Sequence, residues 1–337
     1  MSPPSPPSPP SIVLAGATGD LGGRIVTALL ARGASVRAIV RRGSALEKLA
    51  SLRDQGAEVA EIDFKNVAEL TAVCSGGTCV VSALSGLRDV IVEMQTSLLT
   101  AAVAAGVPRF IPSDFCMDFT GLAPGTNRNL DLRRVFKDRL DAAPIAATSI
   151  FNGAFTDMLT GQAPIILFKV RRVLYWEDAD QRMDFTTKDD TAAFTAAAAL
   201  DRSTPRILRV AGDQISARGL MTVAAAVTGK QYHLLRAGGL GTLGTIIKLV
   251  RKLFPADGAV YPVWQGMQYM HNMFSGRATL DPLDNTRYPG MYWTRARDVL
   301  AAHDRTATSS PGVAVSQERA LDSRPSTRVQ VTRPHRS

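Results

Sequence analysis

Short apolar runs alternate with stretches of helical periodicity along the first half of the chain. The helical stretches cover about residues 22–32, 45–55, 67–74, 89–105 and 129–142, and the apolar runs that flank them are SIVLAG, SVRAIV, EVAEID, CVVSAL, PRFIPS and IAATSIF. Strands at this pitch, each followed by a helical connection, are typical of a parallel sheet with helices on both faces. We therefore predict an α/β fold built on a doubly wound parallel sheet.

The rhythm changes after Phe155. A helix-like TAAFTAAAAL, a short strand ILRVAG and a helix over about residues 217–227 precede a long segment, residues 261–294, that mixes aromatic residues, methionines and glycines and reads as irregular. Such a segment often forms a substrate-side lobe, because ligands bind outside the carboxyl ends of the strands. An extension that covers the core without touching a ligand would have the same composition. We expect a main domain over residues 11–155 and a smaller C-terminal substrate-side lobe over residues 156–303.

The two ends of the chain differ from this core in composition. Residues 1–10 consist largely of Ser and Pro, which predicts a disordered leader of polyproline character. Residues 304–337 are rich in Ser, Thr, Pro and Arg, with six arginines against three acidic residues, which predicts a disordered basic tail. The formal net charge is +9, but no zinc-finger spacing or aromatic-basic recognition strand accompanies the tail. We therefore do not predict a nucleic-acid partner.

The remaining composition narrows the class of protein. The chain is 45% hydrophobic and 20% charged, and no apolar run reaches the roughly 18 residues of a membrane span. This predicts a cytoplasmic protein without a membrane partner. Cys74, Cys79 and Cys116 lack CxxC spacing, so we expect free core thiols and no metal site.

The segment IVLAGATGDLGG follows the first apolar run and opens the first helix. Its GxxGxxG spacing suits a pyrophosphate, because the tight turn leaves no room for a Cβ and the helix N-terminus supplies unpaired amides. A glycine turn with a purely structural role is the alternative. The residues expected to bind a dinucleotide here are Gly16, Thr18, Gly19, Asp20, Leu21 and Gly22.

The end of the second strand reads AIVRRGS, where a site that prefers NAD would place Asp or Glu against the ribose hydroxyl. Arg41 and Arg42 would instead pair with the 2′-phosphate of NADP(H), to which the guanidinium fork is suited. A solvated basic turn is the alternative for these two residues. Asp63 closes the third strand, where it would either accept a hydrogen bond from the adenine amine or cap a turn.

Two further patterns limit the chemistry. Gly239, Gly241 and Gly244 follow a strand-like run, but no later strand completes a βαβ unit, so we expect a flexible loop. None of the six tyrosines has a lysine four residues later. Proton transfer by such a Tyr/Lys pair is therefore excluded.

The motifs GATGDLGG, VRR, VSALSG and RFIPSDF, the last from Arg109 to Phe115, resemble the NmrA-like and isoflavone-reductase-like group of atypical short-chain dehydrogenases. The resemblance covers about residues 11–303 and implies an NADP(H)-binding Rossmann domain with a variable substrate cleft. Asp114 could alternatively cap a helix. The residues that the resemblance places beside the nicotinamide are Ser82, Ala83, Leu84, Ser113, Asp114, Phe115, Asn152 and Gly153.

The reductase branch of this family implies a lysine general acid/base on the helix after RFIPSDF. Lys137 is the only lysine in NLDLRRVFKDRL, and the arginines around it would lower its pKa as proton transfer requires. Counting back from TSIFNGAF, however, places the family's lysine position nearer to Leu132–Arg134. Lys137 would then be a surface residue paired with Asp141 at i+4.

Two functions follow from the resemblance. One is an NADPH-dependent reductase of a small hydrophobic carbonyl or alkene. The other is a regulator that senses NADP(H) and acts through a protein partner without turnover. The absent Tyr/Lys pair and the register of Lys137 leave both open.

Overall fold

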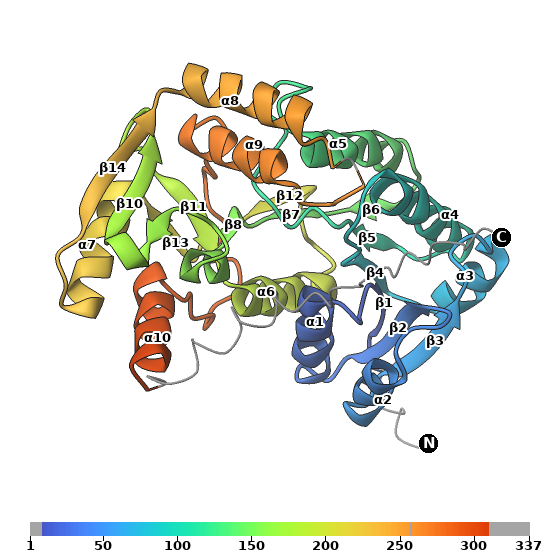
Figure 1. Ribbon diagram of the computed structural model, residues 1–337. Coiled ribbons are helices and arrows are strands. Elements are labelled where there is room, and N and C mark those ends of the chain that lie inside the picture. The colour runs from blue at the N-terminus through green and yellow to red at the C-terminus, as the bar shows by residue number, and fades with distance from the viewer. Residues whose placement is uncertain (1–8, 257, 310–337) are drawn as a thin grey trace, which may run out of the picture.

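The computed structural model describes residues 9–256 and 258–309, and a sheet of six parallel strands lies at its centre (Figure 1). The strand order is β3-β2-β1-β4-β5-β6, with every neighbouring pair parallel. The order reverses between β1 and β4, as in a doubly wound sheet, so the predicted Rossmann fold is confirmed. The strands are β1 (Ser11–Ala15), β2 (Ser35–Arg41), β3 (Glu58–Ile62), β4 (Cys79–Ser82), β5 (Arg109–Ile111) and β6 (Ala146–Ala147).

Helices cover both faces of this sheet. Ile12 and Leu14 of β1 belong to one buried cluster and Val13 and Ala15 to another, because successive side chains of a strand point to opposite faces. The first cluster is closed by α1 (Asp20–Leu30), α2 (Leu46–Asp54) and α6 (Lys188–Leu200). The second is closed by α3 (Val67–Cys74), by α4 (Gln95–Ala104) with the π-helical turn before it (Asp89–Met94), and by α5 (Arg128–Asp141).

Helix α6 comes from beyond residue 155, the predicted boundary of the main domain, yet it belongs to the core of the Rossmann sheet. Ala192 and Ala196 share a buried cluster with Ile25 and Leu29 of α1, and Figure 1 shows the two helices side by side. Small side chains allow this close approach. The change in sequence rhythm at Phe155 therefore does not separate two cores.

Two small sheets form the second lobe, with strand orders β14-β10-β9 and β13-β11-β8. Helices α7 to α10 lie around them, and Phe185, Leu243 and Phe274 are in their common core. Strand β7 (Ser149–Phe151) follows β6 but lies outside the central sheet, where it pairs with β12 (Ile207–Arg209). The other elements are β8 (Ala154–Phe155), β9 (Ile166–Leu167), β10 (Arg172–Trp176), β11 (Met183–Thr186), β13 (Asp213–Ile215), α7 (Ala217–Thr228), β14 (His233–Gly238), α8 (Leu240–Leu253), α9 (Val263–Phe274), α10 (Ala296–Ser309) and two 3-10 turns (Thr156–Thr160 and Phe168–Val170).

Three expectations for this half of the chain are wrong in detail. Gly241 and Gly244 lie inside α8 and not in a flexible loop, because Leu243 and Ile247 give that helix a buried face. The segment 261–294, expected to be irregular, contains α9. Helix α10 runs past residue 304, where the disordered tail was predicted to begin. Residues 1–8 of the predicted leader and 310–337 of the tail lie outside the described residues.

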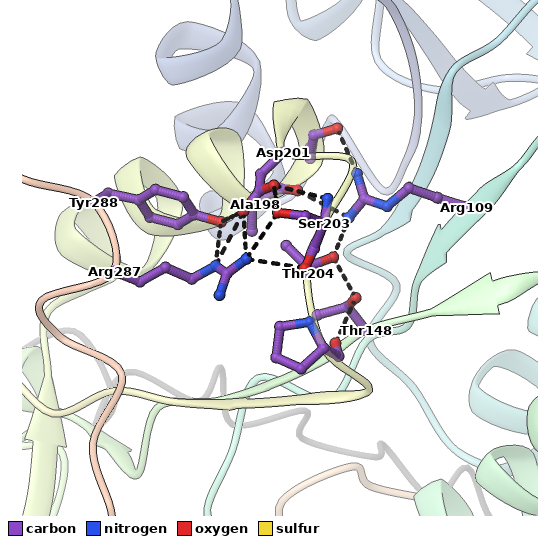
Figure 2. A network of polar contacts seen from close by, with 10 residues as sticks. Arg109, Thr148, Ala198, Asp201, Ser203, Thr204, Arg287 and Tyr288 are labelled. Carbon is purple, nitrogen blue, oxygen red and sulfur yellow. Dashed lines mark hydrogen bonds and ion pairs between the residues drawn. The ribbon is translucent and has the colours of Figure 1, made fainter.

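An arginine at the start of β5 fixes the end of α6 (Figure 2). Arg109 is buried, and its guanidinium donates to the carbonyls of Ala198 and Ala199 at 3.0 and 3.1 Å and to the Thr204 hydroxyl at 2.6 Å. The two carbonyls belong to the last turn of α6, where the helix dipole favours a cation. Arg109 is thus compensated by a helix C-terminus.

A second cluster lies beside it in Figure 2. Asp201 accepts hydrogen bonds from Arg287 at 2.8 Å and from the Tyr288 hydroxyl at 2.9 Å. Arg287 also donates to the Ser203 carbonyl at 3.0 Å. The cluster therefore ties the chain after α9 to the end of α6, at the amino end of β5 and away from the carboxyl edge of the sheet.

The three cysteines, Cys74, Cys79 and Cys116, are buried and free, as predicted for core thiols. Within residues 9–256 and 258–309, no helix is long and apolar enough to cross a bilayer.

Candidate functional site

The turn between β1 and α1 has no room for a side chain at two of its glycines. Gly16 has a φ of +88°, and a Cβ there would lie 2.6 Å from the carbonyl oxygen of Ala83, just after β4. A Cβ at Gly22 would overlap the carbonyl oxygen of Gly16 and lie 2.7 Å from its carbonyl carbon. The N–H of Gly19, the N-cap of α1, donates to that carbonyl at 3.0 Å. The glycines thus let the first turn of α1 lie directly against the ends of β1 and β4.

The first turn of α1 leaves its amides available. No side chain caps the helix, and the N–H groups of Asp20, Leu21 and Gly22 have no acceptor within it. The positive end of the helix dipole points to the carboxyl edge of the sheet. The Thr18 carbonyl, in the same turn, accepts from Lys48 at 3.2 Å. Free amides at the positive end of a helix are the groups with which helix N-termini bind phosphate.

Two cations offset the negative charge of Asp20 in this turn. Lys188 Nζ donates to Asp20 Oδ2 at 2.6 Å, and Arg24 Nε donates to Oδ1 at 2.8 Å. These hydrogen bonds, first that of Lys188, lower the pKa of Asp20, so the carboxylate is ionised at neutral pH. Arg24 also pairs with Asp189, beside Lys188 at the start of α6. The start of α6 therefore brings a cation to the turn.

The two arginines at the end of β2 differ in their partners. Arg42 Nη2 donates to both carboxylate oxygens of Glu69, at 2.8 and 2.9 Å. The exposed side chain of Arg41 has no partner among the described residues, whereas its carbonyl holds the turn by accepting from Ser44. Arg41 is therefore the better placed of the two to meet an added phosphate, since Arg42 would first have to leave Glu69.

Asp63 caps the turn after β3, which is one of the two roles expected for it. Its Oδ1 accepts from the backbone N–H of Lys65 at 3.0 Å, and its carbonyl accepts from the N–H of Asn66 at 2.8 Å. Both contacts shape the turn after β3. A hydrogen bond from adenine would use the remaining carboxylate oxygen and stays a prediction.

Near the carboxyl ends of β4 and β7, two buried polar side chains have no hydrogen-bond partner among the residues that the structure describes. Ser82 and Asn152 are fully buried, and neither Ser82 Oγ nor either side-chain atom of the Asn152 amide is satisfied. The Asn152 backbone is fixed, since its N–H donates to the Cys116 carbonyl at 2.9 Å. The next residue, Gly153, has a φ of +68°, and a Cβ there would lie 2.7 Å from the carbonyl carbon of Asp184. Such orphaned groups are rare in native proteins and point to a missing partner such as a ligand.

The residues after β5 are also buried and held in place. Ser113 Oγ donates to the Leu84 carbonyl at 2.6 Å, which links this loop to the end of β4. Asp114 Oδ2 accepts from the Ser149 hydroxyl at 2.7 Å, whereas its Oδ1 has no partner within residues 9–256 and 258–309. Burial raises the pKa of Asp114, which favours the neutral carboxyl. Phe115 is buried in the core cluster that contains Ile12 and Leu14.

Lys137 lies on α5 in an ion pair. Its Nζ donates to Asp141 Oδ2 at 2.5 Å, and Asp141 also accepts from Arg206 Nε at 2.8 Å. Lys137 lies four residues, or about 6 Å along the helix axis, after Arg133. The structure thus contains the i+4 pair, and a proton-transfer role for Lys137 stays a prediction.

Arg133 is a buried residue of α5 that was not predicted as part of the site. It is 7% exposed, and its Nε donates to the Ser113 carbonyl at 3.0 Å, so it lies against the loop after β5. A signal was present, because Arg133 stands three residues from both Leu130 and Phe136 in the apolar stripe of α5. A charged residue in such a stripe is unusual.

Taken together, the carboxyl edge of the sheet fits a dinucleotide. A pyrophosphate would lie on the uncapped start of α1, in the space that a side chain at Gly16 or Gly22 would fill. Arg41 would face the phosphate on the adenine side, and the unpaired Ser82 and Asn152 groups would face the other end. No acidic residue stands in the RRGS turn that follows β2, where a ribose hydroxyl would bind.

The sequence profile of the NmrA-like family matches residues 10–285 of the chain. Pinoresinol reductase 2 from Arabidopsis thaliana is 30% identical over 199 residues, which are 55% of this chain and 63% of the relative. A bifunctional pinoresinol-lariciresinol reductase from Linum perenne is 28% identical over 241 residues, which are 66% of this chain and 76% of the relative. The match thus spans just under two thirds of the Arabidopsis relative.

Solved structures share the fold over most of the chain. AtPrR2 in complex with NADP+ and (+)pinoresinol superposes with a TM-score of 0.74 at 23% identity, over 88% of this chain and 99% of that one. Isoflavone reductase superposes with a TM-score of 0.73 at 20% identity, over 87% and 99% of the two chains. At these identities the likeness establishes the fold.

Proposed function

The chain belongs to the NmrA-like family, and from this we propose that it is an NADP(H)-dependent reductase of a small hydrophobic carbonyl or alkene. The relatives that it resembles are named as reductases of pinoresinol or lariciresinol, and one structural neighbour holds NADP+ and (+)pinoresinol. These names favour an enzyme with a small-molecule substrate over a regulator that acts through a protein partner.

The observation that carries the proposal is the closeness of the glycine turn to the strand ends. At Gly16 and Gly22 the neighbouring backbone itself excludes any side chain, so the residue type is dictated by the approach of α1 to the sheet. That approach aims uncapped amides at the carboxyl edge, and the unpaired Arg41 lies at the end of the next strand. A purely structural turn would account for the two glycines, whereas uncapped amides with an arginine at the end of the next strand also suit a phosphate.

In this proposal, different residues at the carboxyl edge of the sheet bind different groups of the cofactor. The amides of Asp20, Leu21 and Gly22 bind the pyrophosphate, and Arg41 binds the 2′-phosphate with Arg42 as its second donor. Bound NADPH supplies a hydride. Ser82 and Asn152 orient the nicotinamide with their unpaired polar groups, together with the backbone of residues 82–84, 113–115 and 153.

Reduction also consumes a proton, and Lys137 is the candidate donor that the family resemblance gives. Its Nζ is held by Asp141, so it would have to leave this partner to reach a substrate. Lys137→Ala separates the two roles, because loss of a general acid lowers turnover by about 10²-fold or more. An activity that survives in Lys137→Ala would leave the residue only its ion pair.

The cofactor part is tested by calorimetric titration of the protein with NADP+, NADPH, NAD+ and NADH. The Arg41→Ala/Arg42→Ala protein should bind NADPH about tenfold or more weakly, since each tenfold step corresponds to about 1.4 kcal/mol and the phosphate loses charge-assisted hydrogen bonds. Its affinity for NADH should change little. Arg53→Ala is the control, because Arg53 is also an exposed arginine but lies in the last turn of α2 and pairs with Glu61.

The reductase part is tested by NADPH oxidation in the presence of a panel of hydrophobic enones, quinones and lignans that includes pinoresinol. Substrate-dependent oxidation that the double arginine variant loses at low NADPH would support the proposal. Absence of binding to all four nicotinamide dinucleotides, oxidised and reduced, would refute it.

A further inference from the structure

The side chain of Arg133 is a buried cation without a carboxylate partner. Its Nε donates to the Ser113 carbonyl at 3.0 Å and its Nη1 to the Asn129 carbonyl at 3.2 Å. Among residues 9–256 and 258–309, no acidic side chain lies within 4.0 Å of it, and its Nη2 has no hydrogen-bond partner. Burial of a charge is costly unless a counter-charge compensates it.

No described acidic residue near Arg133 forms an ion pair with it. Asp114 acts on its charge only from beyond 4.0 Å, and the Oδ2 of Asp114 accepts from Ser149 at 2.7 Å. Asp118 is engaged at 2.8 Å by Arg209. Among the described residues, therefore, no carboxylate is paired with the guanidinium of Arg133.

The other buried arginine, Arg109, shows what a compensated site looks like. It makes three hydrogen bonds, two of them to carbonyls of the last turn of α6, where the negative end of the helix dipole lies. Arg133 makes two, one of them to the carbonyl of Asn129 in the first turn of its own helix. That turn is the positive end of the α5 dipole, which adds to the charge of Arg133 instead of offsetting it.

The surroundings of Arg133 suit an organic anion. Ser113, to which it donates, follows β5 at the carboxyl edge of the sheet and is tied to Leu84 at the end of β4. Cys116 and Tyr269 lie near its guanidinium, and both belong to an apolar cluster with Phe119. An aromatic or apolar ligand body would pack there, with an acidic group turned to the guanidinium.

We infer that Arg133 is an anion-binding residue of the substrate site and that the substrate is an organic acid with an aromatic or apolar body. The free Nη2 edge of the guanidinium would donate to one oxygen of its carboxylate. The inference rests on the proposed function only for its placement beside the cofactor. The binding event itself requires no turnover.

The test uses trans-cinnamate and trans-cinnamamide, which have the same carbon skeleton and differ in charge. Calorimetry gives the affinity of each probe for the full-length protein, with and without saturating NADP+. The variants are Arg133→Gln, which removes the charge, and Arg133→Lys, which retains it. Arg134→Gln is the matched control, because Arg134 lies next on the same helix and also donates to backbone carbonyls, those of Phe119 and Leu122, at 2.8 Å.

Wild-type protein and Arg134→Gln should bind cinnamate about tenfold or more tightly than cinnamamide, as expected for a charge-assisted hydrogen bond in a buried site. Arg133→Gln should lose this preference, and Arg133→Lys should keep part of it. A purely structural Arg133 would change stability without changing the ratio of the two affinities. Equal binding of the probes to wild-type protein overturns the inference even if Arg133→Gln does not fold, and so does a preference that persists in Arg133→Gln.

The same samples keep this test apart from that of the proposed function. NADP+ affinity is measured before the probes are added, so a protein that binds cinnamate but no dinucleotide would retain the anion site and lose the reductase proposal. A protein that binds NADP+ but not the acid would retain the reductase proposal and lose the anion site.

Discussion

Two adjacent glycines of α1 should respond in opposite ways to the same substitution. A Cβ at Gly22 would overlap the Gly16 carbonyl oxygen and lie 2.7 Å from its carbon, both of which are backbone atoms that cannot rotate away. A Cβ at Gly23 would meet nothing closer than the Ala17 carbonyl oxygen at 3.5 Å, an ordinary contact. Gly22→Ala therefore displaces the turn, and Gly23→Ala is its matched control.

The magnitude follows from what the two variants share. Alanine is favoured over glycine in a helix by about 0.8–1.0 kcal/mol, and this gain is common to both. Forced overlap in a packed region costs about 1–3 kcal/mol and applies only at Gly22. The difference in the free energy of unfolding between the variants isolates the overlap, so Gly22→Ala should be about 1–3 kcal/mol less stable than Gly23→Ala.

Cofactor affinity gives a second, independent readout. The Gly16 carbonyl accepts the hydrogen bond that orders the turn, so its displacement moves the amides that would hold the pyrophosphate. NADPH should bind Gly22→Ala about tenfold or more weakly, or by about 1.4 kcal/mol, and Gly23→Ala nearly as well as wild type. Urea unfolding and titration of NADPH fluorescence measure the two quantities. Equal stability and equal affinity in the two variants would refute the reasoning.

Three further substitutions test other parts of the structure. Lys188→Met leaves the Asp20 carboxylate less neutralised at the start of α1 and should weaken NADPH binding about two- to fivefold, in line with the 0.3–1 kcal/mol effect of a charge at a helix terminus. Asp20→Asn in the same protein should restore the affinity. Arg109→Met removes three hydrogen bonds from the end of α6 and should lower stability by about 1.5–3 kcal/mol in thermal unfolding, with NADPH affinity unchanged. Burial raises the pKa of Asp114, so ionisation of this carboxyl lowers the stability of the folded state as the pH rises above the unfolded-state pKa of about 3.9. Asp114→Asn should therefore raise the melting temperature relative to wild type at pH 8. A difference in melting temperature that does not shrink towards pH 4 would count against this assignment.

The Rossmann half could be predicted from the sequence because its signals are local. Each strand of the central sheet is a short apolar run, and the helix Val67–Cys74 has the bounds expected from its periodicity. The glycines of the turn lie within seven positions of one another, so the motif is visible in the sequence. The backbone that excludes a side chain at Gly16, however, belongs to the distant Ala83.

The second half resisted prediction because its elements are fixed by distant partners. Helix α9 contains Gly266 and several methionines and has weak local signals, but Gln265 and Asn272 bond across to Asn127 at the start of α5, at 2.7 and 3.1 Å. Helix α6 was assigned to a separate lobe because nothing in its alanine-rich sequence states that it packs on α1. The same limit applied to Arg133, whose lack of an acidic partner is a property of the folded chain.

The cations at the carboxyl edge divide into two kinds, and the division bears on what each can recognise. Arg41 and Lys48 are exposed, so water solvates them without a ligand, and salt screens their attraction for a phosphate. Arg133 is 7% exposed, so its charge is less hydrated and less screened than theirs. The exposed cations therefore suit a dinucleotide that brings several charges and binds along the surface. The buried one suits a single acidic group on an otherwise apolar molecule, which is the difference expected between the cofactor end and the substrate end of this site.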